Sequence, residues 1–281
     1  MKEKILRIAQ QAKSASRKLS NISTKIKNES LLSMADLLEE RIVFLVEANS
    51  KDVNFARKKG LSAAMIDRLT LNAARIKDMS KGLREIVALP DPVGEVVRMW
   101  MRPNGLQIGK IRTPLGVIGI IYESRPNVTA DAASLCIKSG NAVILRGGSE
   151  AINSNIAIAK VLSEAGSSKG LPDNSIQLID VTEREAIFEM LKLDTYIDLV
   201  IPRGGHSLIR TVVENSTIPV IKHDKGLCHV YIDSEADLEM GKKIAFNAKV
   251  QRPSVCNAME TLLVHKDVAG SFLPSMIQRF K

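Results

Sequence analysis

Two spacings of apolar residues divide the chain near Pro90. Before it, apolar positions recur every three or four residues, most clearly at Leu31, Met34, Ala35, Leu38, Ile42 and Leu45. That spacing puts them on one face of an amphipathic helix. Gly60 and Pro90 are helix-stop signals, and Ser62 and Thr70 are candidate N-caps. The pattern predicts a helical N-terminal region over residues 1–89.

A different pattern follows, in two short segments of alternating apolar and polar residues at 96–102 and 106–113. The Asn104-Gly105 pair between them is a strong hairpin signal. A projecting hairpin offers an edge on which another subunit can pair. A capped edge that pairs with nothing is the equally open alternative.

From Leu115 onward, apolar runs of strand length alternate with helical patterns. Continuous apolar strands alternating with helices are typical of a parallel sheet covered on both faces. The fold class predicted is therefore α/β, with a Rossmann-like parallel sheet behind the helical N-terminal region. The expected strands are 117–122, 142–145, 175–179, 199–201 and 227–233, and the expected helices are 129–138, 149–164, 183–191, 207–214 and 236–249. A further apolar run, up to Val264, is typical of a buried strand.

Composition narrows the class of protein. Hydrophobic residues make up 45% and no apolar run reaches the length of a membrane span, so no membrane partner is expected. The N-terminus lacks the apolar segment of a secretory signal. Cys136, Cys228 and Cys256 lie far apart without a C-x-x-C pair, which disfavours a disulfide framework and indicates the cytoplasm. The four histidines show no metal-ligand spacing, so no metal site is predicted.

The net charge of +9 raises the question of nucleic acid. The charges interleave with acids along amphipathic helices, and aromatic residues are only 4% of the chain, so solvated helical faces are the favoured interpretation and no nucleic-acid partner is predicted. The positive balance also suits a small anionic substrate.

The ends of the expected strands are polar and rich in glycine, where ligands of parallel sheets bind. Two Gly-Gly turns, 147–148 and 204–205, each follow an arginine and open a helix whose free N–H groups attract anions. Either turn alone can be a tight connection, but two of them favour a dinucleotide site. No G-x-G-x-x-G or Walker loop is present.

Candidate chemistry centres on Cys256, which lies between a turn and an apolar run. A thiolate there is a candidate nucleophile, and a small buried hydrophobe is the alternative. Asn127 could stabilise an oxyanion through its side-chain amide, or could be a helix N-cap. Cys136 and Cys228 fit buried positions in a helix and a strand and are interpreted as structural.

Four motifs in order, 115–127, 140–150, 201–205 and 251–257, resemble the aldehyde dehydrogenase superfamily over essentially the whole chain. The resemblance is greatest to the branch that reduces L-glutamyl 5-phosphate in proline biosynthesis. It implies that Cys256 is the nucleophile and that Asn127 forms the oxyanion hole with the backbone N–H of that cysteine. It implies NADPH as cofactor, with the adenosine ribose and the pyrophosphate held by Arg146, Gly147, Gly148, Ser149 and Glu150 and by Gly204, Gly205 and Ser207.

The activity implied is NADPH-dependent reduction of L-glutamyl 5-phosphate to L-glutamate 5-semialdehyde, with phosphate release, through a cysteine thioester. Aldehyde-oxidising relatives carry a water-activating glutamate where this chain reads His223-Asp224-Lys225-Gly226, which suits a reductase. His223 or Asp224 could still take part in acid–base chemistry. NAD(P)-dependent aldehyde oxidation and a non-catalytic NADP-binding role remain the rival functions.

The resemblance also implies a domain division. Residues 1–101 and 122–255 would form the NADP(H)-binding domain, 102–121 the oligomerisation hairpin of a homo-oligomer, and 256–281 the start of a second α/β catalytic domain. Only 281 − 256 = 25 residues follow the cysteine, whereas members of the family continue well beyond it. We therefore expect a truncated member with an incomplete active site.

Overall fold

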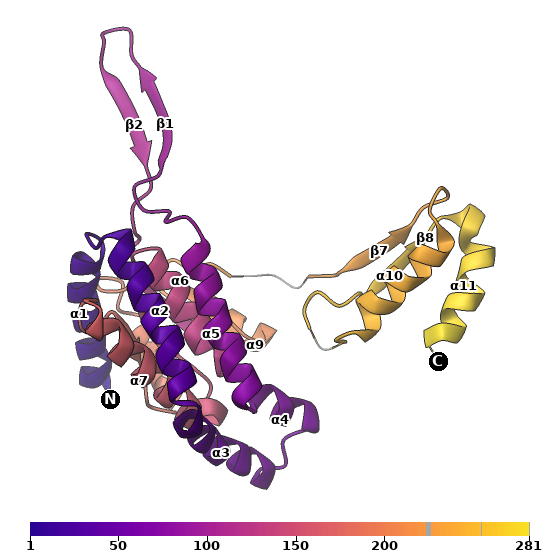
Figure 1. The fold of residues 1–281 in the computed structure, drawn as a ribbon, viewed down its shortest axis with the longest axis horizontal. Coiled ribbons are helices and arrows are strands. Elements are labelled where there is room, and N and C mark those ends of the chain that lie inside the picture. Colours follow the sequence, from indigo (N-terminus) through magenta and orange to yellow (C-terminus); the bar gives the residue numbers. More distant parts are fainter. Residues whose placement is uncertain (223–225, 254, 281) are drawn as a thin grey trace. The chain divides into compact units, whose positions relative to one another are not determined.

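The computed structural model describes residues 1–222, 226–253 and 255–280 (Figure 1). Contacts group the chain into two compact units, Met1–Lys222 and His223–Lys281, called unit 1 and unit 2 below. The boundary predicted between cofactor and catalytic parts was 255/256, so the compact division falls earlier in the chain. Each unit is described by itself.

Unit 1 begins with the predicted helical region. Ser23, Ser62 and Asn72 each cap a helix by accepting a backbone N–H bond on the side chain. Ser62 was predicted as a cap, whereas Thr70 instead lies at the C-terminal end of α4 because Asn72 provides the next cap. The helices are α1 (Lys2–Leu19), α2 (Thr24–Glu40), α3 (Ile42–Lys58), α4 (Ala63–Leu69) and α5 (Ala73–Ala88).

The centre of unit 1 is a parallel sheet of four strands in the order β5-β4-β3-β6. Every residue of β3 and β4 is buried, as their continuous apolar sequences predict. Helices α6 and α7 contact one another and the sheet, while α1 contacts the sheet and packs against α8, so the predicted helix-covered parallel sheet is confirmed. The elements are β3 (Val117–Tyr122), α6 (Asn127–Lys138), β4 (Ala142–Arg146), the short 3-10 helix η1 (Ser149–Ala151), α7 (Ile152–Ser168), β5 (Ile176–Leu178), α8 (Glu185–Met190), β6 (Leu199–Arg203) and α9 (His206–Asn215).

The strand order locates the binding edge. The chain moves from β3 outward to β4 and β5 and then returns to place β6 on the other side of β3. Such a reversal is a topological switch point, and ligands of open parallel sheets bind beyond the carboxyl ends of the strands there. In unit 1 those ends are Tyr122 on β3 and Arg203 on β6, which are paired in register.

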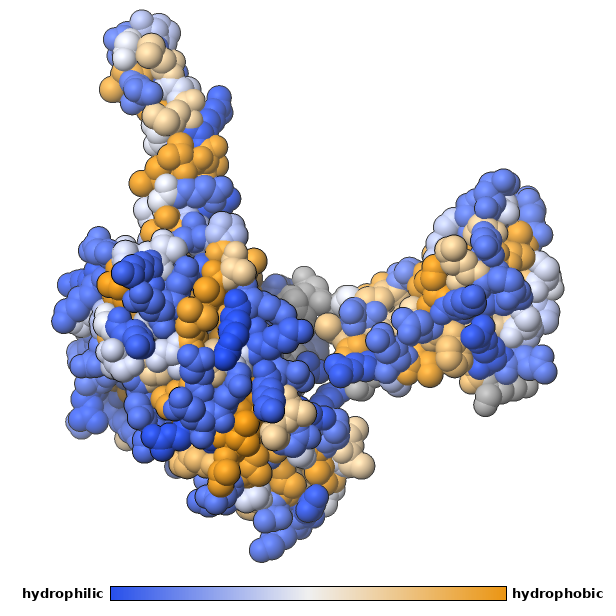
Figure 2. All heavy atoms as spheres, viewed as in Figure 1, coloured by the Kyte–Doolittle hydropathy of each residue, from blue (hydrophilic) through white to orange (hydrophobic). Residues whose placement is uncertain are grey.

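A hairpin of β1 (Val96–Met101) and β2 (Gln107–Ile111) extends from this helical and sheet core (Figure 1). Its bounds differ from the predicted range 102–121, because residues 117–121 are buried in the central strand β3. Figure 2 shows hydrophobic side chains along the hairpin surface. Met99 is 56% exposed and Met101 is 70% exposed, so apolar surface remains uncovered on unit 1.

The root of the hairpin is held by buried charges. Lys27 on α2 contacts Asp91 at 2.5 Å and donates to the backbone carbonyl of Lys138 at 3.3 Å. Lys138, the last residue of α6, donates to Asn28 Oδ1 at 2.8 Å and to the backbone carbonyl of Val87 at 3.0 Å. Pairing is the condition under which charges are tolerated in a protein interior. These contacts tie α2, α5 and α6 to the segment that leads into β1.

Unit 2 contains β7 (His229–Ile232), α10 (Leu238–Val250), β8 (Thr261–Val264) and α11 (Lys266–Phe280). The two strands pair in parallel, and Ile232, Phe272 and Met276 form a small core with the helices. The prediction that the apolar run up to Val264 is a buried strand is only half right. The strand forms, but Leu263 is 46% exposed because β8 pairs with one described neighbour alone.

Candidate active site

A cleft lies at the carboxyl ends of β3 and β4, beside the first turn of α9. Its volume is about 430 Å³. Five of the predicted cofactor residues line it, namely Arg146, Gly148, Ser149, Glu150 and Ser207. Residues that were not predicted complete the lining: Ile121, Tyr122, Glu123, Thr182, Arg184, Ile187, Phe188, Leu208 and Thr211. The structure therefore brings the end of the first glycine turn and the helix that follows the second turn to one cavity, whereas the predicted Gly147, Gly204 and Gly205 are not among its lining residues.

Arg146 supplies a buried positive charge to this cleft. The residue is only 6% exposed, and its guanidinium donates to the backbone carbonyls of Gly147 at 2.8 Å and Thr182 at 3.1 Å. Its Nε has no hydrogen-bond partner among the described residues. Burial lowers the pKa of Arg146, against a smaller raising effect of the Glu150 carboxylate. A guanidinium with carbonyl partners but no carboxylate in direct contact within the described ranges is suited to an anionic or hydroxyl-rich ligand.

Close packing explains why the two turns contain glycine. A side chain at Gly147 would collide with the amide of Asn155 and lie 3.1 Å from the ring of Tyr122. At Gly204 it would lie 2.6 Å from the Glu123 carboxylate and 2.8 Å from Leu208. The glycines keep the backbone close to the sheet edge, which leaves the cleft open above them.

The N-terminus of α7, which follows the Gly147-Gly148 turn, is not free to bind a ligand, contrary to the expectation from sequence. Asp52 on α3 accepts hydrogen bonds from the backbone N–H of Asn153 at 3.2 Å and of Ser154 at 2.8 Å. This carboxylate already satisfies the N–H groups that were expected to attract a ligand anion at α7. At α9, the Glu123 carboxylate accepts from the Gly205 N–H at 2.8 Å.

Glu150 also has an internal partner. Its Oε1 accepts from the backbone N–H of Ser124 at 2.6 Å and from the Ser124 hydroxyl at 2.7 Å. Ser124 has φ of +45°, in the left-handed region that non-glycine residues seldom adopt. The Glu150 carboxylate thus holds the segment after β3 across the edge of the cleft.

Asn127 is the first residue of α6 and is half-buried. Its side-chain Nδ2 donates to Asp131 Oδ2 at 3.0 Å. The alternative role as an N-cap is wrong, because Pro126 holds that position. Burial raises the pKa of Asp131, against the lowering effect of the hydrogen bond from Asn127. The Asp131 carboxylate fixes the orientation of the amide.

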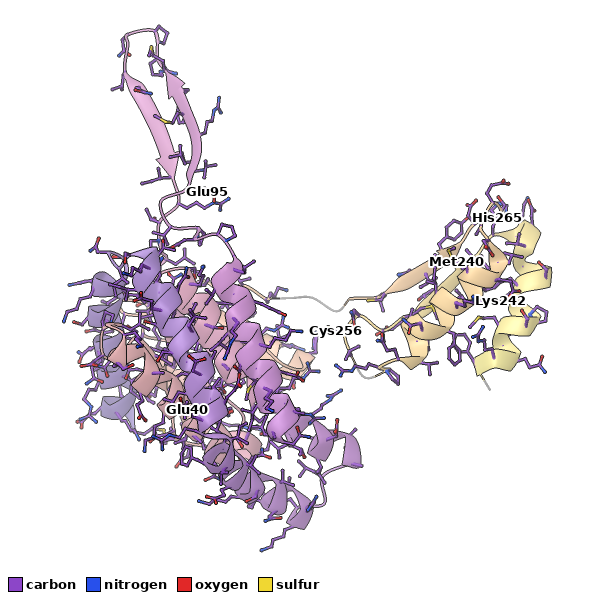
Figure 3. The ribbon with its side chains drawn as sticks, viewed as in Figure 1. Glu40, Glu95, Met240, Lys242, Cys256 and His265 are labelled. Atoms are coloured by element: carbon purple, nitrogen blue, oxygen red, sulfur yellow. The ribbon has the colours of Figure 1, made fainter. Side chains whose placement is uncertain are left out.

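Cys256 lies in unit 2 on the exposed segment between α10 and β8 (Figure 3). Cys136 is buried in α6, and burial raises the pKa of its thiol to about 12. The alternative of a buried hydrophobe is therefore excluded for Cys256 and fits Cys136. Asn127 belongs to unit 1, so its convergence with Cys256 stays a prediction. His223 and Asp224, the possible acid–base groups, lie outside the described residues.

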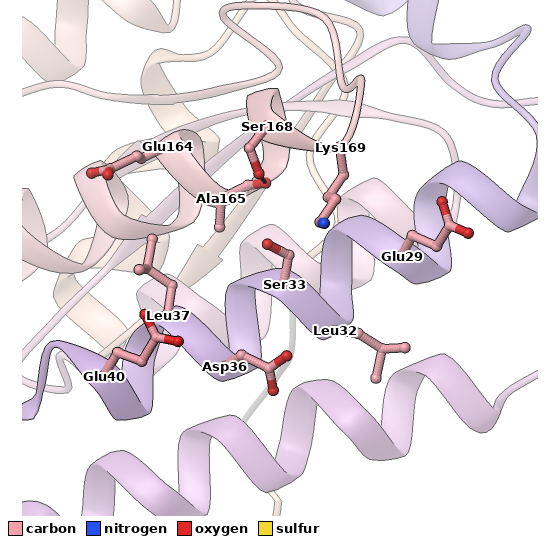
Figure 4. Close-up of a pocket in the computed structure, with 10 residues that line it drawn as sticks. All are labelled: Glu29, Leu32, Ser33, Asp36, Leu37, Glu40, Glu164, Ala165, Ser168 and Lys169. Atoms are coloured by element: carbon pink, nitrogen blue, oxygen red, sulfur yellow. Dashed lines mark hydrogen bonds between the residues drawn. The ribbon is translucent and has the colours of Figure 1, made fainter.

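A larger cavity, of about 660 Å³, lies between α2 and α7 (Figure 4). None of the predicted site residues lines it. Four carboxylates do, and three of them pair with basic side chains: Glu29 with Lys25, Asp36 with Arg84, and Glu164 with Arg41. The cavity is a solvated acidic groove of unit 1.

Metal-binding clusters and membrane-spanning helices are both absent from the described ranges. No group of three or more histidine, cysteine, aspartate or glutamate side chains there is arranged to hold a metal ion. None of the helices in the same ranges combines the length and the apolar character that crossing a membrane requires.

Sequence reasoning missed several residues of the site. Glu123 directly follows β3, and the rule that strand ends carry ligand groups could have identified it. Asp131 lies one helical turn after Asn127, a spacing that indicates contact on one face. Nothing in the sequence pattern indicated Arg184, which lines the cleft, or Asp52, which bonds to the N-terminus of α7, since tertiary packing brings each to its place.

Comparison with known proteins identifies the family to which the chain belongs. The sequence model of the Aldehyde dehydrogenase family matches residues 1–281. Gamma-glutamyl phosphate reductase of Thermodesulfovibrio yellowstonii is 57% identical over 281 residues, which are 100% of this chain and 67% of that protein. The reductase of the same name from Moorella thermoacetica is 60% identical over 272 residues, 97% of this chain and 65% of that protein.

A solved structure agrees with the sequence relatives. The crystal structure of gamma-glutamyl phosphate reductase from Thermotoga maritima matches with a TM-score of 0.92 at 44% identity, over 98% of this chain and 66% of that one. The chain thus spans about two thirds of the length of the relatives it matches. Since the family match covers every residue and the fold of a close relative agrees, the chain belongs to the aldehyde dehydrogenase family, and this membership implies a nicotinamide cofactor.

Proposed function

We propose that this chain is the part of an enzyme that reduces L-glutamyl 5-phosphate to L-glutamate 5-semialdehyde with NADPH and releases phosphate, a step of proline biosynthesis. The observation that carries the proposal is the exposed Cys256 thiol in a chain 57% identical, over its whole length, to a gamma-glutamyl phosphate reductase. Cytoplasmic localisation belongs to the proposal and is supported by three cysteines that form no disulfide.

The strand-end cleft has a donor set that fits the cofactor. The buried Arg146 guanidinium would bind an anionic group such as the 2′-phosphate that distinguishes NADPH from NADH. Ser149 and the positively charged Arg184 line the same cleft. The backbone of Gly147 and Gly148 would lie along the ribose, with Glu150 on its hydroxyls. The turn of Gly204, Gly205 and Ser207 would approach the pyrophosphate, where the N-cap residue Gly205 provides no side-chain cap to the first turn of α9.

The chemistry of the chain's own residues follows from a thiolate and an amide. The Cys256 thiolate attacks the acyl carbon of L-glutamyl 5-phosphate, the bond to phosphate breaks, and a thioester remains on the sulfur. The Asn127 side chain and the Cys256 backbone N–H would donate to the oxyanion of each tetrahedral species. NADPH, when bound, supplies the hydride that reduces the thioester. Collapse of the resulting thiohemiacetal frees the aldehyde and restores the thiol.

The hairpin would join subunits. Exposed apolar side chains on β1 and β2, among them Met99 and Met101, support a homo-oligomer in which the hairpin pairs with a partner chain. An apolar cavity of about 560 Å³ at the base of the hairpin, lined by Val97, Ile111, Leu115 and Ile221 among others, adds to the surface available for such pairing.

Reverse turnover tests the proposal against the aldehyde-oxidising rival. With glutamate 5-semialdehyde and NADP⁺, any NADPH that this chain forms with its incomplete active site should require added phosphate and should be absent in Cys256→Ala. Cys136→Ala, which alters a buried thiol in unit 1, is the matched control and should keep the activity. Turnover without phosphate would favour the oxidase, and turnover unchanged in Cys256→Ala would eliminate the nucleophile.

A second measurement separates catalysis from binding. NADPH should bind the Cys256→Ala chain as tightly as the original, because the cleft is built from unit 1 alone. Binding without any turnover in the unaltered chain would support the non-catalytic role instead.

A further inference from the structure

Two of the three cysteines are in contact in unit 2. The Sγ of Cys228 is 3.3 Å from the backbone carbonyl oxygen of Cys256 and donates to it. The carbonyl and the side chain of Cys256 branch from the same α-carbon, so the Cys228 sulfur lies within reach of the Cys256 side chain. Residues 228 and 256 are far apart in sequence, and the spacing gave no sign of this contact.

Backbone contacts keep the two segments together. The carbonyl of Cys228 accepts from the N–H of Glu260 at 2.9 Å and of Thr261 at 3.2 Å, where β7 and β8 begin to pair. Cys256 lies within a tight turn, in which the N–H of Ala258 donates to the carbonyl of Val255 at 3.2 Å. Closing a disulfide from this arrangement requires rotation of the Cys256 side chain and an adjustment of the turn to the narrow disulfide geometry.

The three thiols differ in solvent accessibility, and the difference favours oxidation of Cys228 and Cys256. Cys256 is exposed and Cys228 is half-buried, so an oxidant can reach at least the first directly. Cys136 is buried in unit 1 and carries a thiol, not a thiolate, at neutral pH. Oxidation should therefore discriminate strongly between Cys136 and the two cysteines of unit 2.

We propose that Cys228 and Cys256 form a site of reversible oxidation, at which a peroxide closes an intrachain disulfide. In the first step the Cys256 thiolate attacks one peroxide oxygen, the O–O bond breaks, and a sulfenic acid and water are produced. In the second step the Cys228 sulfur attacks the sulfenic sulfur and expels a second water. Two thiols are oxidised and one hydrogen peroxide is reduced to two waters. A dithiol reverses the bond by thiol–disulfide exchange.

Disulfide formation at this site does not depend on the proposed function. Its effect on activity, however, rests on that function. If Cys256 is the nucleophile, the disulfide removes the attacking thiolate and also shields it from irreversible oxidation to the sulfinic acid. The second thiol then makes oxidative loss of activity recoverable, which a single exposed cysteine would not.

The test is a peroxide titration of the whole chain, followed by alkylation of the remaining thiols and peptide mass mapping. The expected product has lost the mass of two hydrogen atoms, with residues 228 and 256 in one cross-linked peptide pair and Cys136 still free to be alkylated after unfolding. Cys136→Ser should behave identically. Cys228→Ser should instead gain oxygen at Cys256, and dithiothreitol should restore both thiols in the original chain and in Cys136→Ser.

Several results would overturn the inference. It fails if the original chain gains oxygen at Cys256 while Cys228 remains alkylatable, if the only cross-links join two chains, or if Cys136→Ser no longer forms the bond. Loss and recovery of NADPH-dependent turnover is recorded in parallel. A chain that forms the disulfide but shows no turnover before oxidation would contradict the proposed function and leave the disulfide established.

Discussion

Replacing Asp52 by alanine should destabilise unit 1 by several kcal/mol. This carboxylate is 2% exposed and accepts four hydrogen bonds across the interface of α3 and α7. The donors are the backbone N–H and side chain of Asn153, and the backbone N–H and hydroxyl of Ser154, at 2.6 to 3.2 Å. A buried carboxylate at a helix N-terminus combines a cap with a favourable interaction with the helix dipole.

The magnitude follows from what the substitution leaves behind. Loss of the cap costs about 1–2 kcal/mol. Leaving the buried Ser154 N–H without an acceptor adds about 1–3 kcal/mol, whereas the Ser154 hydroxyl retains the Asn49 amide at 3.0 Å. Asp52→Ala should therefore cost about 2–5 kcal/mol. Asp52→Asn keeps one acceptor oxygen and the volume but loses the charge, so about 1–2 kcal/mol is expected.

Urea unfolding followed by far-UV circular dichroism measures the effect. Glu47→Ala, an exposed carboxylate on the same helix, is the control and should change stability by less than about 0.5 kcal/mol. The NADPH dissociation constant should also rise in Asp52→Asn, because α7 directly follows the turn of Gly147 to Glu150. If Asp52→Ala unfolds at the same urea concentration as Glu47→Ala, the reasoning about this cap is refuted.

Three further predictions use other contacts of unit 1. Gly147→Ala should weaken NADPH binding and cost about 1–3 kcal/mol of stability through overpacking. Gly148→Ala would meet only the end of the Glu150 side chain, so it should cost less stability while displacing the carboxylate that accepts from Ser124; calorimetry on both variants checks this. Burial alone would raise the pKa of Asp91, but hydrogen bonds from a buried lysine and a threonine leave it below its ordinary value. Its stabilisation is therefore present at neutral pH and is lost as pH falls through the folded-state pKa, and Asp91→Asn should flatten the acid side of the stability curve. Burial raises the pKa of Asp131, so its charge opposes folding above the ordinary carboxylate range. Asp131→Asn should raise stability at neutral pH but not below about pH 4, and Asp131→Ala, which frees the Asn127 amide, should lower kcat while the NADPH dissociation constant stays unchanged.

The local sequence pattern was sufficient to predict a strand whose residues are all buried. The strand Val117–Tyr122 was predicted to the residue, because six consecutive apolar positions fit only a strand covered on both faces. The rule for parallel sheets also identified Arg146, Gly148 and Ser207, which line one cleft.

Prediction failed where a property depends on distant partners. The exposure of β8 depends on how many strands pair with it, which its own apolar residues do not encode. The cap on α7 comes from Asp52, about a hundred positions earlier, so the helix N-terminus looked free from sequence. The contact of Cys228 with Cys256 likewise arises only once β7 and β8 pair.

The charged root of the hairpin gives α6 a mechanical role. Lys27 forms an ion pair with Asp91, in the segment that leads into the hairpin, and donates to the backbone carbonyl of Lys138 in the last turn of α6. The opposite end of this 12-residue rod is Asn127. If a neighbouring chain displaced the hairpin, the displacement would thus be transmitted to α6, which carries the Asn127 amide. Assembly and the position of that amide would then be coupled.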